Sequence, residues 1–116
     1  MLASSRDWLL VAENASGSPV GFLAARAVAD EAEILNIAVE PSRRRRGAGR
    51  TLLEAAVTEA VKRGARRLYL EVRASNESAQ AFYVACGFAE VGRRPNYYQD
   101  PPEDAALLAR ALDGGE

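Results

Sequence analysis

The stretch PSRRRRGAGR, residues 41–50, decides how the rest of the chain is interpreted. It follows a short apolar run and precedes a segment whose apolar residues recur at helical spacing. Gly47 and Gly49 would let the backbone approach a ligand closely. The N–H groups at a helix start, the helix dipole and the adjacent arginines all favour a bound anion. A pyrophosphate is the ligand that this stretch suits best.

Two other interpretations of residues 41–50 stay open, namely a solvated basic run before an ordinary helix and a patch that binds nucleic acid. The stretch lacks the Gly-Lys-Ser/Thr ending of a Walker A loop and the G-x-G-x-x-G spacing of a dinucleotide fingerprint. The net charge of −1 provides no global positive field for nucleic acid. We therefore expect no nucleic-acid partner.

The composition excludes several catalytic chemistries. The chain has no histidine and one cysteine, Cys86, so Ser-His-Asp and Cys-His mechanisms and most zinc sites are excluded. We expect no metal, and a general base must be a carboxylate, a lysine, a tyrosine or a water that they hold. A lone cysteine fits a reducing compartment. With no membrane-length apolar run and no signal-peptide pattern, we expect a cytoplasmic protein without a membrane partner.

The chain of 116 residues predicts a single domain over 1–116. Three strands with short turns predict an antiparallel meander, and Gly64 and Gly87 are expected to end two helices. A loop is expected over 95–102. The predicted strands cover residues 8–12, 20–28, 34–39, 67–72 and 88–91, and the predicted helices cover 49–63 and 77–86.

Two polar side chains are candidates for acid–base chemistry. Glu71 lies on a predicted strand, on the face opposite Leu68, Leu70 and Val72. Tyr83 lies in the second predicted helix, twelve residues later. A carboxylate base and a phenolic acid would suit attack by an amine on a thioester. Equally, Glu71 could pair with Arg67 or Arg73 at a surface, and Tyr83 could be a core residue.

Arg44-x-x-Gly47-x-Gly49 resembles the Arg/Gln-x-x-Gly-x-Gly/Ala signature of the GNAT acetyltransferase superfamily. Further segments in the same order are similar to one branch, the ribosomal-protein alanine N-acetyltransferases. The resemblance covers roughly residues 20–112. These segments are Asn36-Ile37-Ala38-Val39, Leu70-Glu71-Val72-Arg73-Ala74-Ser75-Asn76, Phe82-Tyr83, Gly87-Phe88, Arg94-x-Asn96-Tyr97-Tyr98 and Glu103-Asp104-Ala105.

The resemblance implies a GNAT fold: an α/β (α+β) fold with two main helices and a mixed, mostly antiparallel sheet that splays between two parallel central strands. Acetyl-coenzyme A would be the co-substrate, Glu71 the general base acting through water, and Tyr83 the acid that protonates the thiolate. Tyr97 and Tyr98 would line the acceptor side. The implied coenzyme contacts are Ile37, Ala38, Val39, Arg44, Arg45, Arg46, Gly47, Ala48, Gly49, Arg50 and Asn76.

The resemblance also assigns residues 105–109 to a strand, although their alanines and leucines favour a helix locally. The family usually begins with a strand and two helices before the hairpin, which are missing here. We therefore expect an uncovered sheet face or edge, and a homodimer or another partner that covers it.

The favoured function is transfer of an acetyl group to a primary amine, most specifically the N-terminal alanine amine of a ribosomal protein. One alternative acceptor is a small amine or a lysine side chain. Another alternative is a GNAT module that binds coenzyme A without turnover. Cys86 is interpreted as a packing residue, since direct attack needs no acyl-cysteine.

Overall fold

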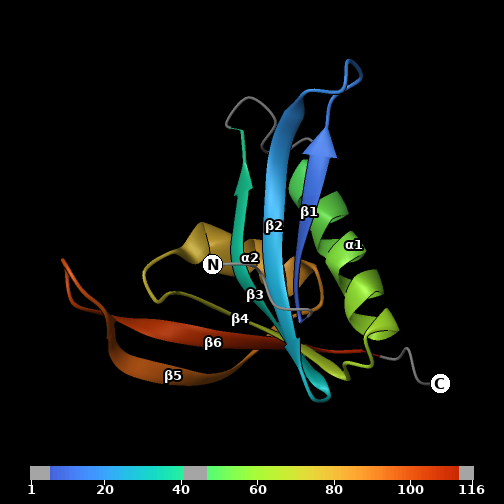
Figure 1. Cartoon of the computed structure of the whole chain (residues 1–116). Coiled ribbons are helices and arrows are strands. Elements are labelled where there is room, and N and C mark those ends of the chain that lie inside the picture. The colour runs from blue at the N-terminus through green and yellow to red at the C-terminus, as the bar shows by residue number, and fades with distance from the viewer. Residues whose placement is uncertain (1–5, 41–46, 113–116) are drawn as a thin grey trace. The chain divides into compact units, whose positions relative to one another are not determined.

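The computed structural model describes residues 6–40 and 47–112 and forms two compact units (Figure 1). The first takes in the chain up to Leu68 and from Leu112 on, and the second is Tyr69–Ala111. Six strands and two helices confirm the predicted α/β class, whereas the predicted splay between central strands stays a prediction. The elements are β1 (Asp7–Glu13), β2 (Pro19–Val28), β3 (Glu31–Val39), α1 (Ala48–Lys62), β4 (Arg67–Arg73), α2 (Glu77–Ala85), β5 (Ala89–Tyr98) and β6 (Glu103–Ala111).

The first unit contains the predicted meander, with β2 antiparallel to both β1 and β3. The Asn14 side chain closes the first turn by accepting hydrogen bonds from the N–H groups of Ser16 and Ser18, each at 3.0 Å. The β3 strand begins at Glu31, three residues earlier than predicted, because Val28 already pairs with Glu31. This pairing leaves a two-residue turn, which is the commonest hairpin connection.

Helix α1 covers one face of this three-stranded sheet (Figure 1). The apolar spacing of α1 buries Leu52, Leu53, Ala56 and Ala60 completely or nearly so. Gly21 in β2 permits the close contact, because an added Cβ would lie 2.9 Å from the carbonyl oxygen of Ala38 and 3.3 Å from Cδ1 of Leu52. As predicted, Gly64 follows the helix end with φ +87°.

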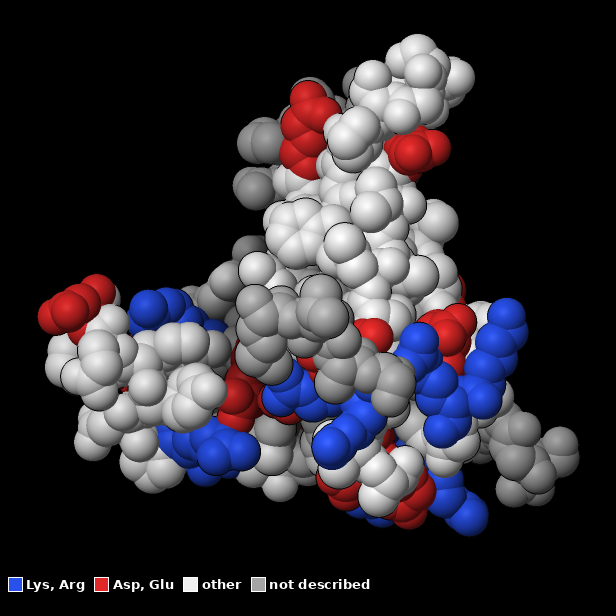
Figure 2. Space-filling model, viewed as in Figure 1, with Lys and Arg blue, Asp and Glu red and all other residues white. Residues whose placement is uncertain are grey.

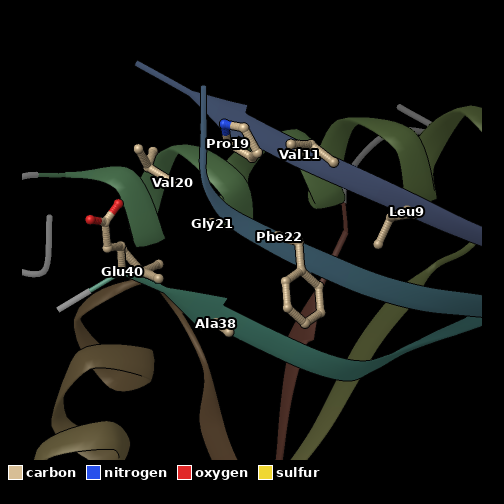
Figure 3. Close-up of a pocket in the computed structure, with 9 residues that line it drawn as sticks. Leu9, Val11, Pro19, Val20, Gly21, Phe22, Ala38 and Glu40 are labelled. Carbon is tan, nitrogen blue, oxygen red and sulfur yellow. The ribbon is translucent and has the colours of Figure 1, made fainter. Parts of the chain in front are cut away.

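The opposite face of the β1–β2–β3 sheet is apolar and exposed. Leu9 and Val11 are 62% and 50% exposed, and the pairing of Val11 with Phe22 and of Phe22 with Ala38 places these side chains on one face. Figure 2 shows mostly uncharged surface over the upper part of these strands, with acidic side chains at its margins. A groove of about 610 Å³ lies here, and Figure 3 shows its lining: Leu9, Val11, Pro19, Val20, Gly21, Phe22, Ala38, Val39 and Glu40. An exposed face was predicted, and its cover by a second copy stays a prediction.

The second unit has the strand order β4–β6–β5. Leu68, Leu70 and Val72 are buried at alternate positions of β4, as predicted. Helix α2 begins at residue 77 as predicted, and the Asn76 side chain caps it by accepting a hydrogen bond from Ala79 N at 3.1 Å. At its other end the Arg110 guanidinium donates to the Cys86 carbonyl at 3.0 Å, which satisfies a terminal acceptor of the helix.

The predicted loop over residues 95–102 is wrong in its first half, because β5 continues to Tyr98. The β5–β6 register shifts between Arg94 and Tyr98, and Asn96 adopts φ +53° there. Such a bulge accommodates Pro95, which has no N–H group, within a strand at the sheet edge. The Asn96 N–H donates instead to the Asp104 carboxylate at 3.0 Å. The strand predicted over 105–109 is confirmed and extends over Glu103–Ala111.

Candidate functional site

The start of α1 has the properties of an anion site. Gly47 is its N-cap with φ +87°, a left-handed conformation that glycine adopts readily. The first hydrogen bond joins Thr51 N to the Gly47 carbonyl at 2.9 Å, so the N–H groups of residues 48–50 precede the helical ladder. The first turn contains no acidic residue. Of the predicted coenzyme contacts, Gly47, Ala48, Gly49 and Arg50 thus lie at this helix start, whereas Arg44, Arg45 and Arg46 lie outside the described residues.

The strand β3 directs the backbone groups of two predicted coenzyme contacts away from β2. Glu40 N donates to the Val20 carbonyl at 2.8 Å, so these two residues form a hydrogen-bonded pair. Such pairs alternate with pairs whose backbone groups point outward, and the register is regular over residues 36–39. The N–H and C=O groups of Ile37 and Val39 therefore point to the other edge of β3.

Glu71 occupies the β4 face opposite the buried leucines, and its side chain is only 12% exposed. Its carboxylate forms an ion pair with Nε of Arg94 on β5. The Nε atom of Arg94 faces Oε2 of Glu71, and this oxygen is buried. Removing the arginine would leave a nearly buried charge without its partner, which is costly.

Tyr97 and Tyr98 lie next to Glu71 because β5 extends beyond its predicted end. The Arg94 guanidinium lies 5.6 Å from the centre of the Tyr97 ring, and the two tyrosine rings meet edge to face at 5.1 Å. Burial raises the pKa of the Tyr98 phenol, and the negative charge of Glu71 raises it further. We call Glu71, Arg73, Arg94, Tyr97, Tyr98 and Glu103 the Glu71 cluster.

The other half of the Glu71 cluster fixes the turn between β4 and α2. Glu103 accepts a hydrogen bond from Ser75 N at 2.5 Å and pairs with Arg73 at 3.3 Å. Arg73 in turn lies 4.3 Å from the centre of the Tyr98 ring. These contacts hold the residues before Asn76, the predicted coenzyme contact, whose side-chain oxygen serves as the helix cap.

Tyr83 is a buried residue of α2, only 9% exposed. Its ring meets Phe82 and Phe88 edge to face at 5.2 and 5.8 Å. Burial raises the pKa of its phenol, and neighbouring Cys86 adds to the rise. The phenol therefore keeps its proton at neutral pH, as an acid must before it donates.

The structure thus brings Glu71 together with Tyr97 and Tyr98 in the second unit, and it places the β3 edge and the α1 start in the first unit. The sequence did not identify Arg94 as the partner of Glu71, although Arg94 belongs to the Arg-x-Asn-Tyr-Tyr segment that carries part of the family resemblance.

Among residues 6–40 and 47–112, no group of three acidic, histidine or cysteine side chains could hold a metal ion. No helix within those ranges is long and apolar enough to cross a membrane.

Comparison with known proteins identifies the family to which this chain is similar. The family described as Acetyltransferase (GNAT) family matches residues 2–88. A [Ribosomal protein bS18]-alanine N-acetyltransferase of Escherichia coli K12 is 47% identical over 96 residues, which are 81% of this chain and 65% of that protein. The protein of the same name from Salmonella typhimurium is 48% identical over 90 residues, 76% of this chain and 61% of that protein. The chain therefore spans less than two thirds of these relatives.

Solved structures agree with this similarity. The crystal structure of the ribosomal-protein-S18-alanine N-acetyltransferase from Escherichia coli superimposes with a TM-score of 0.84 at 42% identity, and the match covers 95% of this chain and 72% of that one. An IAA acetyltransferase from Bacillus cereus gives a TM-score of 0.85 at 28% identity, covering 92% of this chain and 79% of that one.

Proposed function

Because this chain belongs to the acetyltransferase (GNAT) family, we propose that it transfers the acetyl group of acetyl-coenzyme A to the N-terminal alanine amine of a ribosomal protein. The observation that carries this proposal is the 47% identity over 96 residues to an enzyme named for that reaction. The candidate base Glu71, the candidate acid Tyr83 and the candidate anion site at the start of α1 support the proposal.

The residues of the first unit fit acetyl-coenzyme A. The pyrophosphate would bind the N–H groups of residues 48–50, where no acidic side chain of the first helical turn opposes it. The pantetheine arm would bind along the edge of β3, where the backbone groups of Ile37 and Val39 point away from β2. The thioester that this co-substrate supplies is an activated acyl group.

The acid–base residues lie in the second unit. An α-amino group has a pKa near 7.7–8.0, so part of it is already neutral at pH 7 and Glu71 need remove only the remaining proton, through water. The amine nitrogen then bonds to the thioester carbonyl carbon, and the C–S bond breaks. Tyr83 gives its proton to the departing thiolate. The Glu71 carboxylate, whose Oε2 is paired with Arg94, is the acceptor for the proton of the water or the amine.

Tyr97 and Tyr98 would contact the acceptor. Tyr98 lies close enough to Glu71 for the carboxylate charge to raise its pKa, and Tyr97 packs against Tyr98. Aromatic rings with a polar tip bind extended backbone through both packing and hydrogen bonds.

The test compares acceptors with purified protein and acetyl-coenzyme A. Two peptides of identical sequence start with alanine, one with a free amine and one with a blocked amine, and a third starts with a larger residue. We expect acetylation of the free alanine peptide alone, read by mass spectrometry. Preference for lysine side chains or small amines would replace the proposed acceptor, and coenzyme binding without turnover would leave a binding module.

A further inference from the structure

The ion pair between Glu71 and Arg94 is asymmetric. The Glu71 side chain is 12% exposed and the Arg94 side chain is 59% exposed. A nearly buried carboxylate requires a partner, whereas an exposed arginine can remain solvated. The pair therefore matters mainly for the buried Glu71 carboxylate. An ion pair between two exposed side chains would contribute little to stability.

The strand order makes this pair a specific construction. Arg94 is on β5 and Glu71 on β4, with β6 between them, so the arginine must span about 10 Å of sheet. The residue of β6 directly opposite Arg94 is Ala105, whose small side chain shares the face of Arg94 and leaves room for the guanidinium to cross. The Ala105 side chain is 0% exposed, so other side chains cover β6 at the position opposite Arg94.

Arg94 also connects the carboxylate to the acceptor side. Its guanidinium lies 5.6 Å from the centre of the Tyr97 ring, within the range of a cation–π contact. Tyr97 meets Tyr98 edge to face. One side chain therefore contacts both the Glu71 carboxylate and the first of the two tyrosines.

We propose that Arg94 is a positioning residue that holds the Glu71 carboxylate in the direction from which it receives the proton of the acceptor amine. This inference rests on the proposed function and adds to it a residue that acts through Glu71. Arg94 itself exchanges no proton and forms no bond with the acetyl group. Without it, Glu71 keeps its place on β4 but its carboxylate turns freely.

The matched control for Arg94→Ala is Arg93→Ala. Arg93 is the preceding residue on β5, and it pairs with Glu90 at 2.8 Å on the exposed surface. Both variants remove one arginine from an exposed position of one strand, so they share any effect of net charge or strand propensity. Arg94→Lys keeps the charge but lacks the planar guanidinium.

The experiment measures kcat and KM for the alanine peptide, and acetyl-coenzyme A binding by calorimetry. Misplacing a catalytic group by about 1 Å can cost about 100-fold, so we expect Arg94→Ala to lower kcat by about 10-fold to 100-fold. KM and coenzyme binding should stay near the wild-type values, Arg94→Lys should recover part of kcat, and Arg93→Ala should match the wild type.

A double-mutant cycle separates positioning from a structural role. In a Glu71→Gln background, Arg94→Ala should cost almost nothing more in kcat, because its effect passes through the carboxylate. Equal, additive losses in both backgrounds would overturn the inference, as would a loss confined to KM or a gain in kcat. A wild-type protein that binds acetyl-coenzyme A but acetylates no amine would instead overturn the proposed function, which is a different result.

Discussion

Substitution of Gly49 by glutamate should change coenzyme binding and protein stability in opposite directions. Gly49 lies in the first turn of α1, where backbone N–H groups precede the helical ladder and the first turn has no acidic residue. A carboxylate there repels a pyrophosphate about 4 Å away by about 1 kcal/mol in water and about 4 kcal/mol at the lower effective dielectric of a protein surface. The expected loss of affinity is therefore roughly 5-fold to 1,000-fold.

The same carboxylate interacts favourably with the helix dipole, so the free energy of unfolding should rise by about 0.3–1 kcal/mol. Calorimetric titration with acetyl-coenzyme A measures the first effect and urea unfolding the second. Thr58→Glu is the matched control, because Thr58 is an exposed residue of the same helix, about two and a half turns further on. Unchanged affinity in a stably folded Gly49→Glu protein would refute the assignment of the pyrophosphate to this helix start.

Three further predictions concern the second unit. Asn76→Ala should lower the free energy of unfolding by about 1 kcal/mol in urea, because the cap bond to Ala79 N is lost, and Asn76→Asp should retain it; equal losses in both would contradict the cap. Tyr83→Phe keeps the packing on Phe82 and Phe88 but removes the phenol that would act as the acid. We expect kcat to fall by about 10²-fold to 10⁴-fold while the affinity for acetyl-coenzyme A is retained. An unchanged kcat would exclude Tyr83 as the acid. Hydrogen bonds from Ser75, and then from Arg73, lower the pKa of Glu103 below its ordinary value of 4.5. The stability that the ionised Glu103 adds is therefore complete above pH 4.5 and is lost as the pH falls through the lowered pKa. In urea unfolding between about pH 6 and pH 3, Glu103→Gln should lose less stability than the wild type, and equal losses would contradict this.

Most elements of the fold could be predicted because their signals are local. The apolar spacing of α1, the alternation in β4 and the cap at Asn76 each depend on residues close in sequence. The β6 strand could not be predicted that way, because Ala105–Ala109 favour a helix by composition. Its strand state comes from pairing with β5, which only the family resemblance anticipated.

The contacts of the site depend on how three strands align, and local patterns do not contain this information. Pro95 and Asn96 are typical of a loop, so the bulge that carries β5 on to Tyr98 could not be predicted. Without that bulge, the rings of Tyr97 and Tyr98 would not be placed beside Glu71. The Glu71–Arg94 pair likewise requires β6 between the two strands, with a small residue opposite the arginine.

The most direct test of the central claim is a transfer assay that counts both products. Purified protein, acetyl-coenzyme A and an alanine-initiated peptide are mixed, and free coenzyme A thiol and α-acetylated peptide are measured over time. We expect the two to form in equal amounts, with Glu71→Gln slower by about 100-fold or more. Binding of acetyl-coenzyme A without acetylated peptide, or a Glu71→Gln protein as fast as the wild type, would contradict the account.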